Sequence, residues 1–162
     1  MLLNSKIDEC DTMIVHLTQS QIEADPYRLW NEFVGIIADK ASVTDPIQEP
    51  AHLVFAYESE VQNGGHLQFF ENGHGTHVQQ TIASLHHLGA HCQAKILEDA
   101  GGLWVTEDRG PVLSREEFVE RALEQRFSEV DERFGRCSPD LLEVLGHYFD
   151  RFRDAFVHVS DS

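Results

Sequence analysis

The chain has 162 residues, of which 41% are hydrophobic and 25% are charged, and these values are typical of one globular domain. Its 28 acidic and 12 basic residues leave a formal net charge of −16, without a basic patch for nucleic-acid phosphates or an apolar run long enough for a membrane span. No signal peptide is expected from the acidic N-terminus, and three widely spaced cysteines, Cys10, Cys92 and Cys137, predict reduced thiols in the cytoplasm.

Apolar residues recur at i, i+3 and i+4 along most of the chain, which predicts an all-α fold. We expect a single compact domain over residues 1–162 with about six or seven helices. The short β-branched run from Met13 to Leu17 can be extended. Loops are expected at 41–50, which holds two prolines, and at 101–113. The predicted helices are 26–39, 51–62, 64–72, 77–88, 94–100, 115–135 and 139–156.

Several predicted helix ends carry local signals. Thr18 and Gln21 have the spacing of a capping box, in which each side chain bonds the other residue's backbone N–H. Asp25 followed by Pro26 is expected to cap the first long helix, because Asp accepts bonds from first-turn amides and Pro is tolerated there. Gly89 is expected to stop the helix that precedes it.

The segment EVQNGGHLQFFEN, which begins at residue 60, places two adjacent glycines inside a helical pattern. A glycine in a helix interior costs about 1 kcal/mol relative to alanine, so a tertiary contact has to compensate. Glycine also allows a positive φ or the close approach of another helix. We therefore expect a buried corner between two helices, with Asn63 capping the second helix. Leu67 and Phe70 are expected to be buried there, and Gln68 and Asn72 to bond backbone ends.

Two ligand-binding alternatives remain beside this architectural interpretation. The backbone amides of Gly64 and Gly65 would suit an anion or a partner peptide at a helix N-terminus, although two nearby glutamates oppose an anion. A cluster of potential metal ligands also lies within 27 residues, with His87 and His91 four apart as in zinc sites. It lacks a closed four-ligand spacing, so no metal, cofactor or catalytic residue is assigned. The cluster comprises His66, His74, His77, His87, His91 and Cys92.

The same glycine segment resembles the core motif of a bacterial family of domains of unknown function, named after an acidic DNA-mimic protein. Leu88-Gly89-Ala90 and the step from Val130 to Phe134 match later parts of the family pattern, so the resemblance covers about residues 20–156. His66 departs from it, because the family usually has an apolar aromatic residue there. The matching motif residues are Glu60, Asn63, Gly64, Gly65, Gln68, Phe69, Phe70 and Asn72.

The resemblance implies an all-helical, often dimeric protein without established catalytic activity, and the founding member resembles DNA in surface charge. A domain of this length is roughly 40 Å across, and DNA of that length carries about 24 phosphate charges. Sixteen net charges on all faces would be too dilute, so mimicry requires one acidic face or a dimer. Candidate partner-binding acids on the predicted helix 115–135 are Glu116, Glu120, Glu124 and Asp131. Two i, i+4 ion pairs favour an ordinary solvated face instead, Glu117–Arg121 and Glu129–Arg133.

Charge and resemblance together predict a non-enzymatic, acidic protein-interaction domain in the bacterial cytoplasm, without a cofactor. The expected partner is a protein with a basic surface, such as a DNA-binding regulator, and the expected assembly is a homodimer. No direct contact with nucleic acid or membrane is expected. The alternatives are a metal-dependent protein or enzyme that uses the cluster from His66 to Cys92, and an immunity-type protein that neutralises a basic toxin.

Overall fold

A computed structural model describes residues 12–39, 45–105 and 112–161. Within these ranges the fold is mostly helical, as predicted, and none of the helices is long and apolar enough to span a membrane. The elements in chain order are β1 (Val15–Thr18), α1 (Gln19–Ala24), α2 (Arg28–Ala38), α3 (Gln48–Glu71), the 3-10 helix η1 (His74–His77), α4 (Val78–His87), α5 (His91–Val105), α6 (Arg115–Leu123), α7 (Ser128–Gly135), α8 (Leu141–Arg151), the 3-10 helix η2 (Arg153–Ala155) and β2 (Val157–Ser160).

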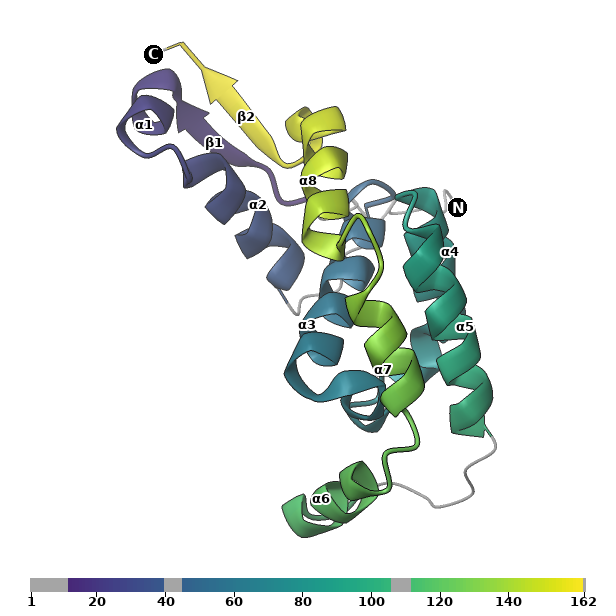
Figure 1. Ribbon diagram of the computed structural model, residues 1–162. Helices are drawn as coiled ribbons and strands as arrows, with labels where there is room; N and C mark the ends of the chain where they lie inside the picture. The colour runs from purple at the N-terminus through teal and green to yellow at the C-terminus, as the bar shows by residue number, and fades with distance from the viewer. Residues whose placement is uncertain (1–11, 40–44, 106–111, 162) are drawn as a thin grey trace, which may run out of the picture.

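Helix α3 is the central element and contacts α2, α4, α7 and α8. Helices α4 and α5 pack against each other beside it, and α7 lies against α5 (Figure 1). The core between them is rich in fully buried aromatic and aliphatic side chains, among them Phe33, Tyr57, Phe69, Leu85 and Leu97. The two strands and α6 lie at opposite ends of the molecule (Figure 1).

A two-stranded parallel sheet joins the beginning and the end of the described chain. β1 falls in the run that was expected to be extended, and its Val15 lies opposite Val157 of β2. β2 was not predicted, because the last helix was expected to continue to Phe156. That helix ends at Arg151, and Phe156 enters the core through the following 3-10 turn and is fully buried.

Helix α3 begins inside the predicted loop 41–50, and α5 continues past the predicted stop. Asp45 supplies the missing signal for α3, since its carboxylate accepts the backbone N–H groups of Ile47 and Gln48 at 2.8 and 2.9 Å. α5 runs through Gly101 and Gly102 to Val105. Glycines weaken a helix without ending it, and packing against α4 and α7 holds this one.

Of the predicted helix-end signals, two are confirmed and one is wrong. Thr18 and Gln21 form the capping box in front of α1, and Gly89 adopts a φ of 85° directly after α4. Asp25 is the C-cap of α1 and does not cap α2 as predicted, because α2 begins only at Arg28. The Asp25 carboxylate instead accepts the backbone N–H of Tyr27 at 3.0 Å.

The predicted helix 115–135 is two helices. Ser114 caps the first by accepting the backbone N–H of Glu117 at 3.1 Å. Gln125 then adopts a φ of 54°, which a continuous helix cannot contain, and α7 starts at Ser128. The chain therefore changes direction between α6 and α7 (Figure 1).

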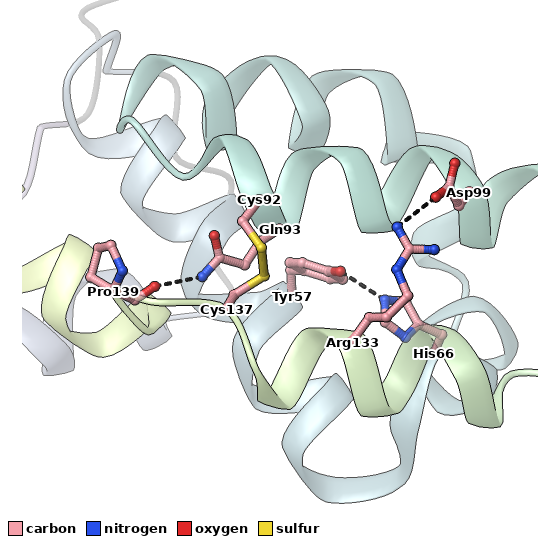
Figure 2. The surroundings of a disulfide bond; sticks show 8 residues. All are labelled: Tyr57, His66, Cys92, Gln93, Asp99, Arg133, Cys137 and Pro139. Carbon is pink, nitrogen blue, oxygen red and sulfur yellow. Dashed lines mark hydrogen bonds and ion pairs between the residues drawn. A yellow bond between two sulfur atoms is a disulfide. The ribbon is translucent and has the colours of Figure 1, made fainter.

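The prediction of three reduced thiols is wrong, because Cys92 and Cys137 form a disulfide bond. The two residues are 45 positions apart, and no local pattern joins them. Packing of α7 on α5 brings their Cα atoms to 5.9 Å. Beside the bond, Gln93 donates to the backbone carbonyl of Pro139 at 2.8 Å (Figure 2). A cytoplasmic location inferred from free thiols loses this support and stays a prediction.

We expect the substitution Cys92→Ala to lower the free energy of unfolding by about 3–4 kcal/mol, because the disulfide closes a long loop in the unfolded chain. Urea unfolding of the oxidised protein and the variant measures the difference, with Cys10→Ala in both chains to prevent thiol exchange. Each chain is also unfolded with a reducing agent present. Reduction should lower the urea midpoint of the parent protein, because it breaks the disulfide, and leave the urea midpoint of the variant unchanged. Equal midpoints in all four samples would contradict a stabilising cross-link.

Candidate functional site

The glycine segment forms the predicted corner, inside α3. Gly64 has φ −153° and ψ 22°, Gly65 has φ 71° and ψ −175°, and both are non-helical. Asn63 is not the predicted cap, because it belongs to the half of α3 before the break. Leu67 and Phe70, in the second half, are buried as predicted.

The cap of the second half of α3 comes from another helix. Asp131 of α7 accepts the backbone N–H of His66 at 2.9 Å, which is the bond that a local N-cap side chain would make. The same carboxylate oxygen lies 2.6 Å from Nδ1 of the His66 ring. A Cβ on Gly65 would lie 2.7 Å from the other Asp131 oxygen. Glycine is therefore required at 65 both for the positive φ and for the approach of Asp131.

His66, which follows the glycine pair, is fully buried, at 0% exposure. Its Nε2 lies 2.7 Å from the hydroxyl of Tyr57, which is also 0% exposed. Burial and the nearby carboxylates of Asp131 and Glu58 raise the pKa of Tyr57, so the phenol keeps its proton. A neutral imidazole with its proton on Nδ1 satisfies both contacts, donating to Asp131 and accepting from Tyr57.

An acid, a histidine and a hydroxyl in a row are also the parts of an activated nucleophile. Here the hydroxyl of Tyr57 and the ring of His66 are enclosed by the core, and the rings of Phe69 and Phe134 pack against them. No substrate can reach a hydroxyl in that position without opening the core. The row therefore acts as a buried hydrogen-bonded link between α3 and α7.

Glu60 holds the two halves of α3 together across the corner. Its Oε2 accepts the side-chain amides of Gln68 and Asn72, each at 2.8 Å. The expectation that these two amides bond backbone ends is therefore wrong. Its Oε1 lies 3.5 Å from Nε2 of His74. A Cβ on Gly64 would lie 2.2 Å from the Gln68 amide oxygen, so this glycine makes room for the amide.

The two phenylalanines of the motif fill the core beside this bonded carboxylate. Phe69 stacks on His74, with ring centroids 5.2 Å apart, and Phe70 stacks on Trp104 at 5.1 Å. The motif also lines two surface hollows, of about 430 and 610 Å³. Several polar side chains there are already bonded within the protein, among them Asp131 in the first hollow and His52, Glu60 and Asn72 in the second.

The predicted cluster of metal ligands is distributed over several contacts. His87 and His91 lie on different helices, on either side of Gly89, and it is His86 whose Nδ1 lies 2.9 Å from Nδ1 of His91. The ring of His87 packs against Tyr148, and Cys92 is in the disulfide. Within the described ranges, no group of three or more potential ligands could hold a metal ion.

The candidate partner-binding acids separate into two groups. Glu116, Glu120 and Glu124 are exposed on α6 or at its C-terminal cap. Asp131 is on α7 and bonds His66, so it does not extend their row. The sequence did not indicate this internal role, because the partner of Asp131 is 65 residues away.

Of the two predicted ion pairs, one is formed. Arg121 bonds Glu117 at 3.0 Å. It also bonds Glu71 at 2.7 Å, and the side chains of Arg121 and Glu71 are both buried. Arg133 bonds Asp99 of α5 at 2.8 Å in place of Glu129 (Figure 2). Glu71 and Asp99 lie on other helices, so sequence spacing could not identify them.

Most basic side chains in the described ranges form ion pairs with acids, whereas many acids are exposed. Nine of the twelve basic residues lie in the described ranges, and at least six of these nine form ion pairs, at 2.6 to 3.3 Å. Exposed acids occur at both ends of the molecule, on α1 and on α6. Others in the described ranges include Glu49, Glu98, Glu129, Glu132, Glu143, Asp150 and Asp154.

One carboxyl group in the core lacks a full set of partners. Glu58 of α3 is 6% exposed, and its Oε2 has no hydrogen-bond partner among the described residues. Burial, and next the charge of Asp140 at the start of α8, raise its pKa, against a hydrogen bond with Gln62 that lowers it. The charged form of Glu58 is therefore unfavourable in the folded protein.

A family model described as DMP19-like protein matches residues 43–153, which is more than half of the chain. The matched region runs from the residues just before α3 to η2 and contains the whole glycine corner. No match was found among curated proteins or among solved structures.

We expect Gly65→Ala to lower the free energy of unfolding by about 2–3 kcal/mol, because it strains a positive φ and displaces Asp131 from the backbone of His66. Gly73→Ala is the matched control, since Gly73 has a φ of 88° and nothing within 4 Å of an added Cβ. It should lower stability by only about 1–2 kcal/mol, from backbone strain alone. Urea unfolding measures both, and equal losses would contradict the role assigned to Asp131.

We expect Glu58→Gln to gain stability relative to the parent protein as pH rises from about 4 to about 7. The raised pKa of Glu58 means that the folded state binds its proton more tightly than the unfolded state does. The parent therefore loses stability as pH rises through this range, and the amide does not. Urea midpoints of both chains across the pH range measure the difference, with exposed Glu23→Gln as the control. A stability difference that does not vary with pH would contradict the burial of a charged carboxylate.

Proposed function

The chain belongs to the DMP19-like protein family, and on that premise we propose that it is a non-enzymatic, acidic interaction protein whose partner is a protein with a basic surface. The partner class that fits is a DNA-binding regulator, because such a protein carries a surface built to receive phosphates. The observation that supports this most directly is the large number of exposed acids in a chain whose net charge is −16.

The distribution of the charge limits how DNA could be imitated. Exposed acids lie on helices at both ends of the molecule, so a single chain does not present its whole charge of −16 on one face. The length of DNA that spans such a molecule carries about 24 phosphate charges. A homodimer that joins two acidic faces would bring the charge density closer to that of DNA, and we propose that assembly.

The buried corner supports a non-enzymatic role. The family motif, apart from the exposed Asn63, is accounted for by contacts within the protein: a cap from Asp131, the bonds of Glu60 across the break, and a stacked aromatic cluster. The motif residues therefore maintain the shape of α3, and the proposed partner would be bound by exposed acidic residues. The immunity-type alternative would use the same acidic surface against a basic toxin and differs only in the partner.

We expect partners recovered from native lysate at low salt to be released by added salt and by duplex DNA. Exposed charge pairs are screened within about 10 Å at 0.1 M salt, so affinity should fall steeply as salt is raised. Competition by DNA distinguishes the two kinds of partner. A DNA-binding partner should be released by salt and by duplex DNA, whereas a basic toxin should be released by salt only. Partners that resist both treatments would contradict the proposed function.

A further inference from the structure

Helix α6 has an unusual distribution of side chains between its two faces. Its inward face carries Arg121, which is 8% exposed and bonded to Glu71 and Glu117, and the partly buried Phe118. Its outward face carries Leu123, which is 74% exposed, and Val119, at 47%. Surface helices normally turn apolar residues to the core and charged residues to water, so a buried arginine and two exposed apolar residues depart from the usual pattern.

Glu116, Val119, Glu120 and Leu123 follow the spacing i, i+3, i+4 and i+7, which places them on one side of a helix. Val119 and Leu123 form an apolar pair, and Glu116 and Glu120 form an acidic row beside it. No ion pair in the described part of the chain uses either of these glutamates. We call these four residues the α6 strip.

The orientation of the α6 strip is fixed by the protein itself. The Arg121–Glu71 bond is 2.7 Å long with side-chain exposures of 7% and 5%, so turning α6 over would leave two buried charges unpaired. Breaking a buried ion pair is strongly destabilising, because it leaves a charge in the interior without its partner. Burying Val119 and Leu123 against the body of the molecule would therefore require the loss of this pair. The exposed apolar residues are held outward.

We propose that the α6 strip binds an amphipathic basic helix of a protein partner. Leucine-like side chains of the partner would cover Val119 and Leu123, and its lysine or arginine side chains would pair with Glu116 and Glu120. The charge of the acidic row favours a basic partner helix over a second copy of this chain. A second copy of this chain would bring two acidic rows together, whereas a basic helix neutralises them. This inference rests on the proposed function and specifies where and how the partner docks.

The test uses two synthetic peptide probes and the full chain. One probe has leucine and lysine at helical spacing, and the other has the same lysines with alanine in place of leucine. Fluorescence anisotropy at low salt measures their binding. The protein should bind the leucine probe at least about tenfold more tightly than the alanine probe, since apolar contacts add to charge.

Variants of the strip then locate the binding site. Val119→Ser with Leu123→Ser should weaken binding of the leucine probe about tenfold and leave that of the alanine probe unchanged. Glu116→Gln with Glu120→Gln should weaken both and reduce the dependence on salt. The matched control is Leu142→Ser with Glu143→Gln on α8, at exposed positions away from α6, and it should bind like the parent. All substituted side chains are exposed, and urea midpoints verify folding.

The contrary outcomes separate a failure of the α6 strip from a failure of the proposed function. Equal binding of the two probes, or strip variants that bind like the parent, overturns the α6 strip and leaves the proposed function standing. If neither probe binds, the strip is likewise overturned, and competition by DNA for the natural partner decides the proposed function separately. If sedimentation shows a dimer that the Val119→Ser, Leu123→Ser chain cannot form, the occupant is a second copy and our proposal is wrong.

Discussion

The bond between the Asp131 carboxylate and the backbone N–H of His66 is the interaction on which the rest of the structure depends. It caps a helix from outside that helix, and it requires a residue without a side chain at 65. The corner that it stabilises turns the second half of α3 so that Leu67 and Phe70 reach the core. From the same carboxylate, His66 and Tyr57 continue the link into the centre of the protein. Seven of the eight motif residues, all except Asn63, therefore have an explanation in packing, backbone conformation and hydrogen bonding.

The sequence predicted the features that depend on neighbours along the chain. Helical periodicity, the capping box at Thr18 and Gln21, and a break at the paired glycines are local signals, and the structure has all three. The existence of the corner followed from the cost of glycine in a helix. Its construction did not, because Asn63 was the local candidate for a cap and the actual cap is 65 residues away from His66.

Several of the features that were missed depend on residues far away in the sequence. The disulfide joins positions 45 apart, β2 forms only because β1 is there to pair with it, and Arg133 bonds Asp99 rather than the nearer Glu129. The candidate acids on α6 were found from their spacing, whereas the apolar residues between them were assigned to no surface. The face of α6 that points outward is set by Arg121 and its buried partner Glu71, which lies on another helix, and Val119 and Leu123 are on that outward face.

The pairing of β1 with β2 has a practical consequence for handling the protein. Val15 and Val157 are strand partners in a parallel pair, so both strands run outward together, and the described chain leaves the fold along β2 at the end of the molecule opposite α6 (Figure 1). A C-terminal tether on a sensor chip or bead would hold the molecule by the sheet and turn α6 toward the solution. A label attached to α6 would be as far from that support as the molecule allows.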